Sequence, residues 1–157
     1  MVTRSFNTKL ELELEPVWYN EPPMILVKLN SYPLFDDYLK DCKVIQFDKN
    51  LIEGHQRLSI NFFNKKNVDT KGDLDKAIKI NSLTFMGIKS KKFIWKGLYI
   101  PQYPEPWATE QKNLGNNLEP ILSNQTYLGW NGEWALDFTV PIFSWIHHVE
   151  NLGWIYK

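Results

Sequence analysis

An acidic segment near the middle of the chain has the residue types that bind calcium. It offers carboxylate and carboxamide oxygens from Asn64, Asp69, Asp73 and Asp75, with Gly72 between them. Calcium takes several oxygen ligands, so a loop of alternating acids around a glycine can wrap one ion. The spacing is not that of the helix–loop–helix motif Asp-x-Asp-x-Asp-Gly. The alternative is a solvent-exposed turn, because Asp and Gly favour turns through their own hydrogen bonds and backbone freedom.

Aromatic residues in the second half of the chain could form a platform for a sugar. The predicted ligand-binding residues are Tyr99, Tyr103, Trp107 and Trp130. Apolar faces of sugar rings stack on flat side chains, and three prolines in residues 101–107 would hold the rings with little loss of conformational entropy. The alternative is that several of these rings belong to the core, because Trp and Tyr are mostly buried.

Recognisable catalytic motifs are missing from the sequence. His147 and His148 are adjacent, and neighbours on a strand point to opposite faces, so they do not suit a single metal ion. The third histidine, His55, is distant in sequence, and the single cysteine, Cys42, is expected to be a buried structural thiol. The chain has no glycine-rich phosphate loop, nucleophile elbow or Cys-x-x-Cys pair. We therefore expect a protein that is not an enzyme.

Alternating apolar and polar residues predict the strands that must position these groups. Residues 10–15 alternate leucine and glutamate, which indicates a half-buried strand. Residues 24–29, 44–47 and 58–63 are further candidates. Residues 78–85 form another, with a bulge expected at Asn81-Ser82 where the period slips. Residues 49–54 resemble a turn.

The second half of the chain is aromatic and less regular. We expect a strand over 93–100, a helical turn within 108–124 and a hairpin over 127–132 with an Asn-Gly turn. Trp134 is expected to be buried in an alternating strand, and residues 142–149 could form a strand or one short helix. These patterns predict an all-β fold: a jelly-roll-like β-sandwich of two antiparallel sheets with little helix, as one domain over 1–157.

Residues 24–88 resemble a calcium-dependent, xylan-binding type of carbohydrate-binding module. That family has a segment ending in Phe-x-Asn-Asp, a short acidic loop, then Asp-Arg-Asn-Leu and a closing strand. The corresponding segments are 60–65, 66–73 and 75–83. The resemblance implies a jelly-roll sandwich, a glycan ligand and bound Ca²⁺. Lys65 and Asn81 replace two acidic residues of the pattern, which puts the metal in doubt.

Residues 127–156 resemble the C-terminal parts of small uncharacterised proteins of cyanobacterial bacteriophages. This resemblance implies a viral origin and no known activity, with the host cytoplasm or the virion as the location. The chain lacks a signal sequence and a long apolar run, so we expect neither secretion nor membrane insertion.

Composition excludes other classes of partner. The 157 residues include 18 basic and 18 acidic side chains, so the formal net charge is zero. A nucleic-acid-binding protein needs a basic face, so we expect no such partner. With 43% hydrophobic residues the chain can form a core, which excludes disorder.

Two functions follow from these observations. The first is a non-catalytic module that binds a polysaccharide or another glycan through exposed aromatics. The second is a phage structural or host-interaction protein that acts through protein–protein contacts, because Trp and Tyr also anchor protein interfaces. An edge strand at Lys9–Glu15 would favour self-association as a homodimer.

Overall fold

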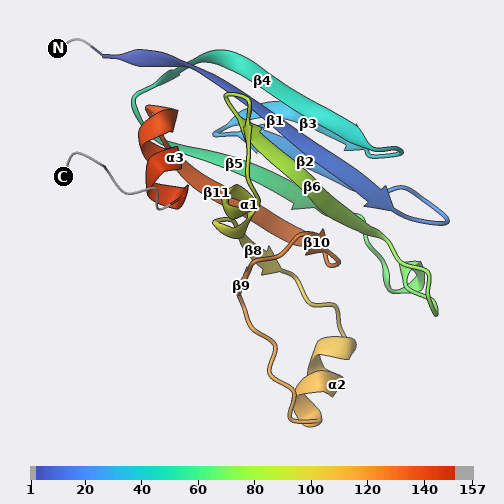
Figure 1. Cartoon of the computed structure of the whole chain (residues 1–157). Coiled ribbons are helices and arrows are strands. Elements are labelled where there is room, and N and C mark those ends of the chain that lie inside the picture. The colour runs from blue at the N-terminus through green and yellow to red at the C-terminus, as the bar shows by residue number, and fades with distance from the viewer. Residues whose placement is uncertain (1–2, 151–157) are drawn as a thin grey trace.

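The computed structural model describes residues 3–150, which form two antiparallel β-sheets packed face to face (Figure 1). The order of strands in the first sheet is β10 (Tyr127–Leu128), β6 (Ala77–Phe85), β1 (Ser5–Val17) and β4 (Lys43–Ile52), with β7 (Ile88–Lys89) paired to β6. The order in the second sheet is β3 (Tyr32–Tyr38), β2 (Met24–Leu29), β5 (Gly54–Phe62), β11 (Gly132–Val140), β8 (Leu98–Pro101) and β9 (Leu122–Ser123). The predicted two-sheet sandwich is therefore confirmed.

The core lies between the sheets and follows the predicted alternation. In β1 the leucines at 10, 12 and 14 are fully buried, and in β11 Trp134, Leu136 and Phe138 are buried in the same way. The pairing of β1 with β6 shifts by one residue at Asn81, which confirms the predicted bulge. Trp134 is core, as expected, because an alternating strand turns every second side chain inward.

Three short α-helices complete the described chain: α1 (Lys91–Trp95), α2 (Trp107–Asn113) and α3 (Ile142–Glu150). Helix α1 packs against β6, α3 packs against β11, and the two helices contact each other (Figure 1). There Phe93 and Trp145 join Phe85 and Phe138 in an aromatic cluster with ring centroids 5.0–6.0 Å apart. No described helix has the length and apolar character to cross a membrane.

The strand predicted over 93–100 is wrong in its first half. Ser90 accepts a hydrogen bond from the backbone N–H of Lys92 and caps α1, and the strand begins only at Leu98. The cap and the inward packing of Phe93 favour the helix over the β-propensity of the segment. The helical turn predicted within 108–124 is confirmed by α2, and residues 142–149 form a helix.

Other local predictions also need correction. β1 is not an edge strand, because β4 and β6 pair with its two sides. The hairpin predicted over 127–132 is absent: β10 pairs with β6 in the first sheet, whereas β11 belongs to the second. β4 continues through Ile52, so the chain turns at Glu53-Gly54. Cys42 is exposed rather than buried.

Helix α2 lies on an excursion between β8 and β9 that projects away from the sandwich (Figure 1). The chain leaves at Gln102, whose backbone N–H donates to the carbonyl of Asn131 over 2.7 Å, and returns to β9. The Tyr103 hydroxyl donates to the carbonyl of Glu119 over 2.6 Å and ties the two arms together. The excursion therefore places the proline-rich segment beside the end of the sandwich.

Candidate functional site

A cleft of about 600 Å³ lies where the excursion meets the end of the sandwich. Three chain segments form its walls: 65–75, which follows β5 and contains the 3₁₀ helix η1 (Asn67–Asp69); 102–107, which leads into α2; and 125–131, which links β9 to β11. The volume falls within the range of small-molecule sites.

Aromatic rings form one wall of the cleft. Trp107 and Trp130 both line it, with ring centroids 6.0 Å apart and ring planes 36° apart. Tyr103 packs behind them, with its centroid 5.0 Å from Trp130 in an edge-on contact and 6.0 Å from Trp107. The three rings contact one another, and these contacts hold the two indole rings in place. Tyr103 itself does not line the cleft.

Three of the four predicted ligand-binding residues lie together here, and the fourth needs correction. Tyr99 is fully buried, because β8 turns it into the core. Its hydroxyl donates to the carbonyl of Trp130 and accepts the backbone N–H of Trp130 over 3.0 Å. Burial raises the pKa of the Tyr99 hydroxyl. Tyr99 therefore fixes the backbone that carries Trp130, and its ring is closed to a ligand.

A hydrogen-bonded carboxylate is the centre of a polar wall of the cleft. Asp75 accepts hydrogen bonds from Lys65 over 2.6 Å, from Thr70 over 2.8 Å and from the hydroxyl of Tyr127 over 2.5 Å. Burial opposes the ionisation of Asp75, but these three bonds outweigh burial and lower its pKa. Burial and the neighbouring carboxylate raise the pKa of Tyr127. At neutral pH the wall therefore holds an ionised carboxylate and a neutral phenol.

Asn131, which directly precedes β11, connects that strand to the polar wall through Lys65. Its side-chain oxygen accepts the backbone N–H of Lys65 over 2.8 Å, and its amide donates to the Lys65 carbonyl over 3.0 Å. The ammonium group of Lys65 also donates to the carbonyl of Gly129. On the opposite rim, Asn67 reaches the carbonyl of Glu105 over 3.4 Å. These contacts link all three walls, so the cleft is built by tertiary contacts.

The predicted calcium ligands do not converge on one point. Asp69 is buried and accepts bonds from the ammonium group of Lys76 over 3.1 Å, from Asn20 over 3.0 Å and from the backbone N–H of Lys66 over 2.7 Å. Burial opposes the ionisation of Asp69, but its hydrogen bonds outweigh burial and lower its pKa. The carboxylate is therefore already neutralised by a cation that belongs to the chain.

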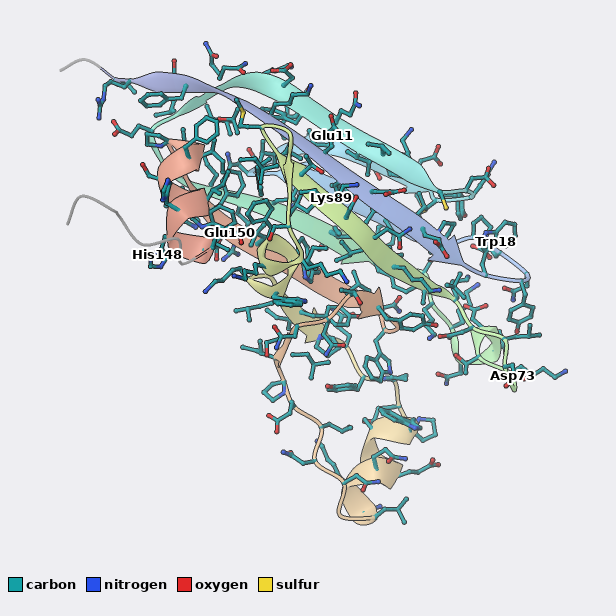
Figure 2. All side chains as sticks on the ribbon, in the orientation of Figure 1. Glu11, Trp18, Asp73, Lys89, His148 and Glu150 are labelled. Atoms are coloured by element: carbon teal, nitrogen blue, oxygen red, sulfur yellow. The ribbon has the colours of Figure 1, made fainter. Side chains whose placement is uncertain are left out.

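The other predicted ligands are also engaged or turned away. Asn64 accepts the backbone N–H of Met24 over 2.7 Å and donates to the carbonyl of Pro22 over 3.1 Å. Asp73 is exposed at the outer tip of the loop (Figure 2). Within residues 3–150, no group of three or more His, Cys, Asp or Glu side chains could hold a metal ion. The site predicted from Asn64, Asp69, Asp73 and Asp75 does not fit calcium, because two lysines occupy the carboxylates.

The histidines lie elsewhere. His55 contacts Asp137 over 2.9 Å on the second sheet, where Arg57 also donates to that carboxylate over 2.8 Å. These two partners hold the pKa of Asp137 below its usual value, with burial opposing them. His147 and His148 lie on α3, and Figure 2 shows His148 at the far side of the molecule from Asp73. None of the three lines the cleft.

Comparisons with known proteins find similarity in structure alone. No protein-family model matches the sequence, and no curated protein matches it. A solved structure described as vCBM60 in complex with galactobiose aligns over 82% of this chain and 96% of its own, with 8% identity and a TM-score of 0.49. A second vCBM60 structure aligns over 82% and 89%, with 11% identity and a TM-score of 0.49. Its description concerns two families of calcium-dependent carbohydrate-binding modules.

These alignments cover a larger part of the chain than residues 24–88. At these identities the similarity does not transfer a ligand or a metal to this chain. The bacteriophage resemblance of residues 127–156 has no support from these comparisons, and residues 151–156 lie outside the described part of the chain.

The polar wall was not predicted from the sequence. Lys65 replaces an acidic residue of the metal pattern, and Tyr127 and Asn131 were expected in a hairpin. One signal was available: Lys65 and Lys76 flank the acidic loop in the sequence, and a lysine can replace a metal as the counterion of a carboxylate. The contacts of Asn131 depend on the crossover between sheets, which no local pattern encodes.

Proposed function

We propose that the protein is a non-catalytic recognition module that binds a glycan in the cleft. The observation that carries this proposal is the pair of indole rings, Trp107 and Trp130, in the lining of a cleft that also contains hydroxyl, amide and carboxylate groups. A sugar ring has an apolar face that stacks on an aromatic ring and a rim of hydroxyls that need donors and acceptors. The cleft offers both chemistries within one small-molecule volume.

Several polar groups that line the cleft still have hydrogen-bonding capacity after their internal contacts. Gln125 and Gln102 line the cleft, and no side-chain hydrogen bond of Gln102 occurs within the described residues. The ionised Asp75 can accept from sugar hydroxyls, since a carboxylate has about four lone-pair sites and three are used here. The groups are already oriented, so binding orders few side chains.

The test is a glycan array that includes xylo- and galacto-oligosaccharides, followed by calorimetry on the best ligand. Trp107→Ala should weaken binding by about 2 kcal/mol or more, roughly thirtyfold in Kd, because it removes an aromatic anchor. Trp95→Ala is the matched control, because Trp95 is 47% exposed on α1 and does not line the cleft. It should leave the Kd unchanged.

The melting temperature separates loss of binding from loss of fold. Trp107 is half-buried against two rings on an excursion outside the sandwich, so Trp107→Ala should lower the melting temperature only slightly. An array without any bound glycan, with and without calcium, would refute the proposal and favour the alternative, a structural or host-interaction role through protein–protein contacts or self-association.

A further inference from the structure

A second hollow adjoins the cleft on the outer face of the second sheet. It has a volume of about 470 Å³, and Gln102 lines both hollows. The chain also passes from one to the other at two further places. Phe63 lines the second hollow and Lys65 the first, and Gly132 lines the second and Asn131 the first. Three neighbouring chain segments therefore form a shared rim, and the two hollows adjoin along it.

The floor of the second hollow is a row of outward-facing residues across four strands. Leu26 of β2 pairs with Asn61 of β5, Asn61 pairs with Glu133 of β11, and Glu133 pairs with Ile100 of β8. Neighbouring strands lie about 4.8 Å apart, so the row spans roughly 14 Å. A floor of that length is longer than a single sugar ring requires.

The side chains of this floor have unused polar groups and one exposed ring. No hydrogen bond or ion pair of the Glu133 carboxylate or the Lys28 ammonium group occurs within residues 3–150, and both residues line the hollow. Phe63 is 50% exposed at the rim that leads into the cleft. The hollow thus repeats the chemistry of the cleft, an aromatic face beside donors and acceptors.

We infer that the ligand is an extended oligosaccharide chain, with one end stacked on the indole rings of the cleft and further units lying over the second hollow. This inference rests on the proposed glycan function and adds the length of the ligand to it. Phe63 supplies the second stacking surface, and Glu133 and Lys28 hydrogen-bond the hydroxyls of the distal units. A chain that continues past the cleft is held at two places instead of one.

The experiment measures affinity by calorimetry against size ladders of xylo-, galacto- and cello-oligosaccharides, from disaccharide to hexasaccharide. The wild-type protein should bind the hexasaccharide of its preferred ladder more tightly than the disaccharide by about tenfold or more, the effect of one well-packed apolar contact. Phe63→Ala should abolish this gain and leave the disaccharide affinity unchanged. The unchanged disaccharide affinity also shows that the variant is folded.

Phe143→Ala is the matched control, because Phe143 is 53% exposed on α3 and lines neither hollow. It should retain the full gain. Equal affinities for disaccharide and hexasaccharide in the wild-type protein would overturn the inference and leave the proposed function standing. A length-dependent gain that persists in Phe63→Ala would also overturn it. Failure of every ladder to bind at any length would instead refute the proposed function.

Discussion

The ion pair between Lys76 and Asp69 is a place where a single substitution should be costly. Both side chains are almost completely buried, with 1% and 2% exposure, and the ammonium nitrogen lies 3.1 Å from Oδ2 of Asp69. The same nitrogen lies 3.4 Å from the carbonyl of Asn64. Lys76→Met keeps the aliphatic bulk of the side chain and removes the charge. The carboxylate of Asp69 then stays buried without its counterion.

The expected loss follows from the burial of the pair. Removal of one partner from a buried ion pair typically costs about 3–5 kcal/mol, because the remaining charge is uncompensated. With a urea m-value of about 2 kcal/mol per M for a domain of this size, the unfolding midpoint should fall by roughly 1.5–2.5 M. The double variant Lys76→Met with Asp69→Asn should recover part of this loss, because it removes the orphaned charge as well.

Equilibrium urea unfolding, followed by tryptophan fluorescence, measures these midpoints. The matched control is Lys79→Met, which breaks an exposed pair: Lys79 and Glu15 are 45% and 37% exposed and 3.7 Å apart. An exposed pair contributes about 0–1 kcal/mol, so the control midpoint should barely move. If Lys76→Met unfolds at the same urea concentration as Lys79→Met, the assignment of Lys76 as the internal counterion is wrong.

Calcium is expected to have no effect on the stability of the wild-type protein. Because Lys76 and Lys65 already neutralise Asp69 and Asp75, neither calcium nor EDTA should shift the urea midpoint. A ligand that binds the folded state must raise the midpoint by mass action. If added calcium raises the urea midpoint and EDTA reverses that rise, the conclusion that these residues do not fit a metal is wrong.

Two further perturbations follow from the structure. The pKa of Asp75 is lowered in the folded state, so its stabilising contribution is present above the unfolded pKa of about 3.9 and is lost as the pH falls through the lower folded pKa. Urea midpoints measured from neutral pH down to about pH 2 should therefore fall in acid, and they should fall less steeply in Asp75→Asn. An equally steep fall in the variant would contradict the hydrogen bonds assigned to Asp75. Gly97→Ala should destabilise the protein by about 1–3 kcal/mol through overpacking, because a Cβ there would lie 2.3 Å from the ring of Trp134. A calorimetric melting temperature equal to that of the wild type would contradict this prediction and show that the ring can move aside.

The strands were predictable because burial in a sandwich has period two. Residues 10–15 favour helix by intrinsic propensity, but their strict alternation determines the strand, since only an extended chain places all three leucines on one side. The bulge at Asn81 was visible for the same reason: one extra residue breaks the period. β3 (Tyr32–Tyr38) was not recognised, because it is an edge strand with no residue in its interior that is fully buried.

The rings of the site could not be sorted from the sequence. Tyr99 and Tyr103 lie four residues apart in the same aromatic segment, yet the first is in the core and the second supports the cleft. The difference arises because β8 pairs with β11 through Pro101 and the chain then leaves the sheet at Gln102. Whether a ring is buried depends on that pairing, and the pairing partner lies about thirty residues away.

Lys65 and Lys76 both stabilise the loop that forms the polar wall of the cleft. Lys65 bonds Asp75 on one wall of the cleft and the carbonyl of Gly129 beside Trp130 on the other, while Lys76 holds the base of the same loop through Asp69. A metal ion in such a loop would make its order depend on the ion's concentration, because binding energy then contributes folding energy. Covalently attached ammonium groups remove that dependence. The polar wall is therefore ordered whenever the chain is folded, and the glycan that we propose as ligand would meet donors and acceptors that are already in position.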